Sequence, residues 1–126
     1  MSGKKYSFDT GIEAANEYLD TVAGSEITIS SADTYESSLR QYGHYLNKEG
    51  ISPLEVSISD IMDHLRARVE QNLSENTISK EITSIKNMYW FHRLEGETQP
   101  ELDLFLLDDI NSSDFNTPTR PDQEPL

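Results

Sequence analysis

Apolar side chains recur at the spacing of an α-helix in the middle of the chain, and this spacing leaves little choice of fold class. Tyr35, Leu39, Tyr42 and Leu46 stand at positions i, i+4, i+7 and i+11, and Gly50 follows them. Residues at these intervals share one face of a helix, and a glycine commonly ends one. We therefore expect a helix that buries one face against other helices, which is typical of an all-α fold.

The same periodicity predicts three further helices. Their apolar faces, in chain order, are Ile12, Ala15, Tyr18, Leu19 and Val22; Ile58, Ile61, Leu65 and Val69; and Ile78, Ile82, Ile85 and Tyr89. The first is expected to run from a cap at Asp9 or Thr10 to Gly24, and the second from a capping box of Ser57 and Asp60 to about Asn72. The third is expected to run from a Ser74 cap to Gly96. For the helix that ends at Gly50, the run 30–33 offers caps. A compact bundle of four to five helices follows.

Outside these helices the sequence is less regular. With 126 residues the chain has room for one domain, which we place at residues 9–96. Residues 1–8 are expected to be a disordered N-terminus, and residues 111–126, with three prolines, an interdomain linker. The apolar segment within 97–110 either packs on the bundle as an extra short helix or leaves its leucines exposed for self-association.

Several classes of site are excluded by what the chain lacks. It has no cysteine, which rules out disulfides and thiolate metal sites, and no run of about 18 apolar residues, so we expect a cytoplasmic protein without a membrane span. His44, His64 and His92 fall on three different predicted helices, and none has another histidine at i+3 or i+4 with which it would build a metal pair. No glycine-rich phosphate loop or nucleophile motif occurs. The sequence predicts no catalytic residue, no metal site and no cofactor.

Charge is distributed unevenly along the chain. The net charge is −13, which by itself argues against a polyanionic partner. Residues 97–126 carry eight acids and one base, however, whereas residues 34–93 carry eight acids and seven bases. The middle of the chain is thus nearly neutral. An acid excess with few lysines is also typical of surfaces adapted to very high salt, so we expect a halophilic, haloarchaeal source.

Two polar helix faces carry no acid. They consist of Ser37, Gln41, His44 and Lys48, with Arg40 beside them, and of Lys80, Thr83, Ser84 and Asn87. Hydroxyls, amides and a few bases donate hydrogen bonds without bulk, as a helix that lies against phosphates and base edges requires. Taken alone, such a face is more often an ordinary solvated surface. The start of the helix after Ser74, with Asn76 and Thr77, adds unpaired N–H groups that favour an anion.

Two segments match a known family pattern. The first contains Thr34-Tyr35, Leu39, Tyr42 to Leu46, Gly50 to Val56 and Asp60-Ile61, and the second runs from Ser74 to Phe91, with a Thr-aliphatic pair, a basic residue, a Ser-aliphatic-basic step and an aromatic cluster. Together they resemble the N-terminal core-binding domain of tyrosine recombinases, the phage-integrase family, which is a SAM-like helical domain. The final stretch, 119–126, is similar to the linker that enters the family's catalytic domain.

The resemblance implies a DNA-binding domain of a site-specific recombinase. This chain would grip one side of double-stranded DNA while a catalytic domain, absent here, closes the other, and four protomers would assemble for integration or recombination. The fragment itself would not be an enzyme. Carried over by position, the DNA-binding residues would be Arg40, Gln41, His44, Lys48, Thr77, Lys80, Ser84 and Asn87.

One departure weakens that carry-over. The family usually has basic residues just after the Tyr35 position, where this chain has Glu36, Ser37 and Ser38. An alternative function, favoured by the net charge, is an acidic helical module that binds a protein or mimics DNA.

Overall fold

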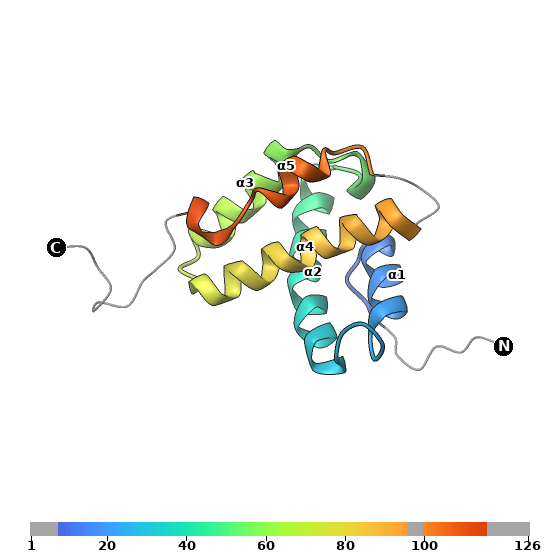
Figure 1. The fold of residues 1–126 in the computed structure, drawn as a ribbon. Helices are drawn as coiled ribbons and strands as arrows, with labels where there is room; N and C mark the ends of the chain where they lie inside the picture. The colour runs from blue at the N-terminus through green and yellow to red at the C-terminus, as the bar shows by residue number, and fades with distance from the viewer. Residues whose placement is uncertain (1–7, 96–99, 116–126) are drawn as a thin grey trace.

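Helix α4 lies at the centre of the fold and contacts every other α-helix. The computed structural model describes residues 8–95 and 100–115 (Figure 1). The α-helices are α1 (Glu13–Val22), α2 (Ile29–Glu49), α3 (Ile58–Val69), α4 (Glu75–Glu95) and α5 (Leu104–Asp108), and short 3-10 helices η1 (Pro53–Glu55) and η2 (Ser112–Asp114) lie between and after them. The all-α bundle predicted from the periodicity is confirmed.

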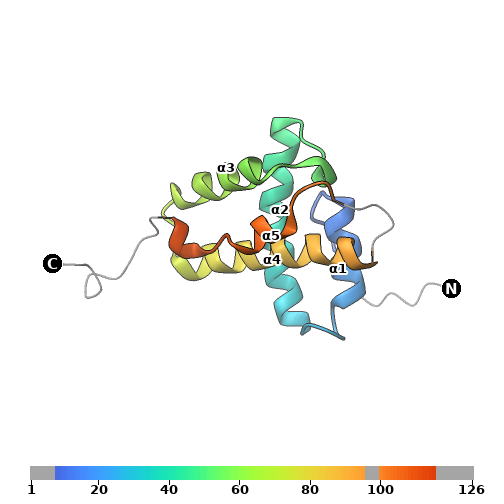
Figure 2. The same cartoon turned by 45° about the horizontal axis from the view of Figure 1, so that its top comes forward.

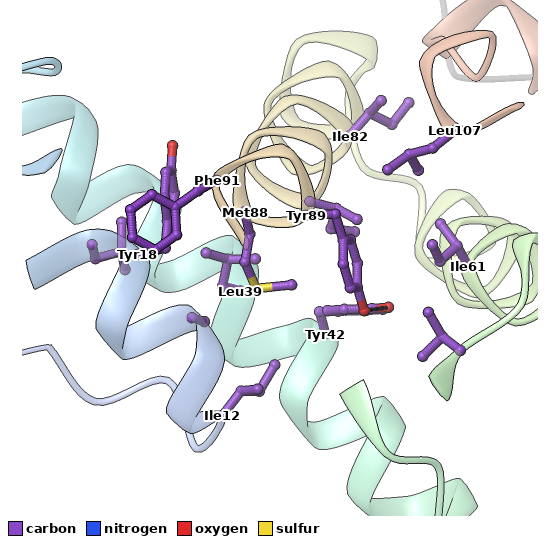
Figure 3. Packing of buried hydrophobic residues seen from close by; sticks show 14 of the residues in the cluster. Ile12, Tyr18, Leu39, Tyr42, Ile61, Ile82, Met88, Tyr89, Phe91 and Leu107 are labelled. Atoms are coloured by element: carbon purple, nitrogen blue, oxygen red, sulfur yellow. Dashed lines mark hydrogen bonds between the residues drawn. The ribbon is translucent and has the colours of Figure 1, made fainter. Parts of the chain in front are cut away.

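The core forms where α2 crosses α4. Leu39 and Tyr42 of α2 and Met88 and Tyr89 of α4 are fully buried there. Figure 3 shows the hydroxyls of Tyr42 and Tyr89 meeting between the two helices, 2.7 Å apart, and Tyr89 also donates to the carbonyl of Pro53 at 2.6 Å. Two large aromatic rings are therefore buried with their polar ends satisfied, which fixes the crossing and ties η1 to it.

Local capping interactions set several helix ends as predicted. The Ser57 side chain accepts from the N–H of Asp60 while the Asp60 carboxylate accepts from the N–H of Ser57, so the capping box that opens α3 is confirmed. Gly50 adopts a left-handed conformation with φ of 69° and ends α2. Ser74 accepts from the N–H of Thr77 at 3.2 Å. The predicted stop at Gly96 lies outside the described residues.

Two helix starts differ from the prediction. Thr10 does not cap α1, because its side chain donates to the carbonyl of Ile12 and pairs with Asn16, and α1 begins at Glu13. Helix α2 begins at Ile29 and uses Thr28 as its cap instead of the run 30–33. In both places several polar side chains compete for the same backbone groups, so the sequence alone does not single out the cap.

Residues 100–115, here called the strap, pack along α4 (Figure 2). Their buried residues include Leu102, Leu104, Leu107 and Ile110. Lys86 donates to the carbonyl of Asp108 at 2.9 Å, and the Trp90 indole donates to the Asp108 carboxylate at 2.8 Å. The leucines of this segment thus serve mainly to cover α4.

Two predicted boundaries need correction. Phe8, expected in a disordered start, is buried in the core, while residues 1–7 lie outside the described residues. Residues 111–115, expected in a linker, contain η2, and Ser112 hydrogen-bonds the Glu75 carboxylate on α4 at 3.1 Å. Both segments lack helical periodicity, so their attachment depends on contacts with distant residues. Residues 116–126 are not described.

Candidate nucleic-acid interface

A groove of about 310 Å³ lies between the N-terminal halves of α2 and α4. It is lined by Thr34, Ser37 and Ser38 from α2 and by Thr77, Lys80 and Glu81 from α4. Four of these six side chains end in a hydroxyl; of these residues Ser37 is exposed, Thr34 and Thr77 are half-buried, and Ser38 is buried. The crossing therefore brings Ser37 and Lys80, predicted on two separate helix faces, and Thr77, predicted at a helix start, to one place on the surface.

Glu81 is the one acid of this groove, and its charge is compensated from α3. The residue is 2% exposed. The Arg68 guanidinium grips its carboxylate in a bidentate arrangement, with Nε at 3.0 and 3.1 Å from the two oxygens and Nη2 at 2.7 Å from Oε2. Arg68 also donates to Gln71 at 3.0 Å. A buried carboxylate held in this way adds little net negative charge to the groove.

Cations on the two predicted faces differ in how far they are free to bind a ligand. Lys48 and Lys80 are exposed and form no ion pair with another described residue. Arg40 instead lies 3.2 Å from the Glu36 carboxylate and donates through Nε to the carbonyl of Asp9 at 3.1 Å. Arg40 therefore ties the N-terminal segment to α2, and its positive charge is largely balanced.

The remaining predicted residues of α2 extend away from the groove. His44 is exposed on the same helix face as Ser37, and Gln41 is half-buried between them. This face continues to Lys48, so it forms an open surface and not a pocket. Its exposed side chains are those that the sequence placed there.

On α4, the prediction for Ser84 is wrong. Ser84 has no exposed surface, and its hydroxyl donates to the Glu81 carbonyl one turn earlier at 2.9 Å. The side chain is covered because α4 is packed on most of its circumference, which leaves a narrower exposed stripe than the sequence pattern indicates. Ser84 is therefore not available to a surface ligand.

Asn87 is exposed, but it lies away from the groove between α2 and α4. It lines a second hollow between α1 and α4 with Tyr18 and Trp90. Burial raises the pKa of Tyr18 to about 12, while a hydrogen bond from Asn87 acts in the opposite direction. Asn87 and Lys80 are thus on one helix stripe but belong to different parts of the surface.

The charges of the described residues are segregated. Residues 8–39 carry seven acids and no base, and the strap carries five acids and no base. All seven basic residues of the described part lie between Arg40 and Arg93. The α4 side of the candidate interface therefore lies where acids and bases balance, whereas its α2 side, with Thr34, Ser37 and Ser38, belongs to the acidic segment.

The histidines occupy three different environments. His64 is buried between the rings of Tyr42 and Tyr45, with centroid distances of 5.3 and 5.2 Å. Burial, and to a smaller extent the nearby Arg68 charge, lowers the pKa of His64 to about 4, so it is neutral at pH 7. The Nε2 atom of His92, also buried, lies 2.7 Å from the Ala14 carbonyl, and His44 is exposed.

Within residues 8–95 and 100–115, no three histidine or carboxylate side chains are grouped so that they could hold a metal ion. None of the described helices combines the length and the hydropathy that crossing a membrane requires.

Comparison with protein families identifies the domain. Residues 15–96 match the model of the phage integrase N-terminal SAM-like domain. The chain belongs to this family. No solved structure matches the chain. The match spans α1 to α4, so this SAM-like domain includes both helices of the candidate interface, whereas the strap lies beyond the matched residues.

Sequence reasoning missed several residues of the interface of this SAM-like domain. Thr34 lies one turn before Ser37, and Ser38 lies one turn after Thr34, so both are at the edge of the predicted polar face. Helix periodicity does not show whether a residue at such an edge lines a groove. Arg68 gave no sequence signal, because its pairing with Glu81 joins residues on different helices.

Proposed function

We propose that this SAM-like domain binds double-stranded DNA through the groove between α2 and α4. The observation that carries the proposal is the convergence of hydroxyl donors and one uncompensated lysine, Lys80, in a single groove of a phage integrase N-terminal domain. Hydroxyls and lysines are the side chains that fix a protein on phosphate oxygens. The membership of the family favours DNA over another anion as the ligand.

The whole protein would be a tyrosine recombinase. In that function the domain grips one side of the recombination-site duplex in the cytoplasm, a catalytic domain elsewhere in the protein cleaves and rejoins strands, and protomers assemble as a tetramer on DNA. Thr77 and Lys80 would bind phosphates together with Ser37. Gln41, His44 and Lys48 would extend the contact along α2, with Arg40 in a supporting position, and Asn87 would make a separate contact from the hollow between α1 and α4.

An NMR titration of the labelled chain with a short duplex at low salt tests the proposal. Shift changes are expected to gather on 34–48 and 77–80 and to weaken as salt is raised, because the lysine contacts to phosphate release counterions. Lys80→Gln should weaken binding, whereas Arg93→Gln, which removes the same charge near the other end of α4, should leave it nearly unchanged. Shifts confined to other surfaces, or equal effects of the two variants, would contradict the proposal.

A second candidate function has its own supporting observation. Residues 8–39, which contain α1 and the start of α2, carry seven acids and no base, and five of these acids are exposed. Such a surface suits a basic protein partner, as in an acidic interaction module or a DNA mimic. In the same titration, no response to duplex together with shifts on α1 on adding a basic DNA-binding protein would favour this alternative.

A further inference from the structure

The groove between α2 and α4 contains the Glu81 carboxylate, whose negative charge would repel DNA. Arg68, from the third helix α3, compensates this charge. Glu81 lines the groove directly after Lys80 in the sequence. Alone, its negative charge would oppose the positive charge of Lys80 at a phosphate a few ångströms away. The three short contacts from Arg68 on α3 remove most of that opposition.

We propose that Arg68 is a positioning residue of the DNA groove, which holds the Glu81 carboxylate and compensates its charge so that Lys80 is the net charge that a phosphate meets. This inference rests on the proposed DNA-binding function. Arg68 need not touch DNA, because it acts through Glu81. The side chain of Arg68 is 14% exposed and that of Glu81 2%, so water screens this pair less than a surface pair.

Among the described residues, only Arg68 and His64 lie within ion-pair distance of the Glu81 carboxylate. His64 Nε2 lies 3.9 Å from the Glu81 carboxylate, and it has no hydrogen-bond partner within the described part of the chain. Since its pKa is about 4, His64 is neutral at pH 7 and does not balance Glu81. The compensation therefore depends on Arg68.

Single and double substitutions separate this role from a purely structural one. Breaking a buried ion pair from either side destabilises a protein, so Arg68→Gln and Glu81→Gln should both lower the melting temperature. Their effects on duplex affinity should have opposite signs. Arg68→Gln should weaken binding about threefold to tenfold, and Glu81→Gln, which leaves the Arg68 charge unbalanced beneath the groove, should strengthen it by a similar factor.

Rescue variants sharpen the test. The double variant Arg68→Gln/Glu81→Gln should bind within about twofold of the wild type, because Lys80 is again the net charge of the groove. Arg68→Lys should also keep most of the affinity, since it keeps the charge, although it loses the bidentate grip and some stability. Glu13→Gln on α1 serves as the matched control, because it removes one acid from an exposed position that does not line the groove.

The experiment is a fluorescence anisotropy titration of a labelled duplex at low salt and about pH 8, with melting curves recorded on the same samples. Opposite changes in affinity that exceed the change in Glu13→Gln support the inference. The inference is overturned if Arg68→Gln and Glu81→Gln both weaken binding. It is also overturned if the gain in duplex affinity of Glu81→Gln is no larger than that of Glu13→Gln. If Lys80→Gln has no effect either, the proposed function itself fails; if Lys80→Gln weakens binding, only the role of Arg68 is refuted.

Discussion

Lowering the pH from about 7 to about 5 is expected to destabilise this domain through His64. The folded protein keeps this ring neutral, with a pKa of about 4, whereas its ordinary value is 6.5. Between these values the unfolded chain binds a proton that the folded chain does not bind. The stabilisation is therefore complete above about pH 6.5 and is lost as the pH falls toward 4. For one such group the loss between about pH 7 and pH 5 is about 2 kcal/mol.

Urea unfolding followed by tryptophan fluorescence or circular dichroism at the two pH values measures this loss. Because carboxylates also titrate in an acidic protein, the informative quantity is the difference between the wild type and His64→Phe. Phenylalanine fills the space between Tyr42 and Tyr45 without a titrating group, so this variant should lose about 2 kcal/mol less than the wild type. His44→Gln changes an exposed histidine and should keep the wild-type dependence.

Equal losses in the wild type and His64→Phe would refute the reasoning. That result would mean that His64 is hydrated in the folded protein, or that protonated His64 finds a partner such as Glu81. A partial difference would still identify His64 as a contributor, with a smaller change in its pKa than the structure indicates.

Two further predictions concern packing. A Cβ atom on Gly43 would lie 2.7 Å from the Thr10 carbonyl oxygen. Gly43→Ala should therefore lower the unfolding free energy by about 1–3 kcal/mol, although alanine is otherwise the better helix residue. If urea titrations instead show a stabilised variant, the N-terminal segment does not pack against Gly43. Leu107 is 1% exposed and Leu106 is 53% exposed. Leu107→Ala should therefore lower the unfolding free energy by about 2–5 kcal/mol, and Leu106→Ala by less than about 0.5 kcal/mol. Equally small losses for the two variants would mean that the strap does not cover α4.

Features that depend on neighbouring residues could be predicted from the sequence. The capping box of Ser57 and Asp60 and the left-handed Gly50 each involve groups within a few residues of each other. The apolar faces of α2 and α3 were likewise predictable, because each helix is covered mainly on one side. In these places the local preference and the tertiary structure agree.

Features set by helix crossings could not be predicted. Helix α4 contacts α1, α2, α3 and α5, so polar residues such as Ser84 and Glu81 are covered despite lying next to exposed positions. Nothing in the local pattern shows which polar residues face a neighbouring helix. Ser84 is buried because its hydroxyl finds an acceptor in its own helix, and Glu81 because Arg68 reaches it from α3.

The candidate interface combines both cases. The faces that contain Ser37, Thr77 and Lys80 follow from helix periodicity, but their meeting in one groove follows from the angle at which α2 and α4 cross. That angle depends on large buried residues, among them Tyr42 and Tyr89. The buried residues of α2 and α4 thus determine which polar residues of the two helices meet in the groove.

The net charge of −13 is a weaker argument against DNA than its size indicates, because charge acts over limited distances in salt. Screening reduces the influence of exposed acids more than about 10 Å away at ordinary ionic strength. Residues 8–33 and the strap hold eleven acids and no base, Glu36 is paired with Arg40 at 3.2 Å, and the groove holds Lys80 and a compensated Glu81. With Lys48 and Lys80 as the unpaired lysines of the two faces, counterion release contributes only about two phosphate contacts. Binding by this domain must therefore depend on hydroxyl donors and on shape, and such a grip loses less to added salt than one built on many lysines.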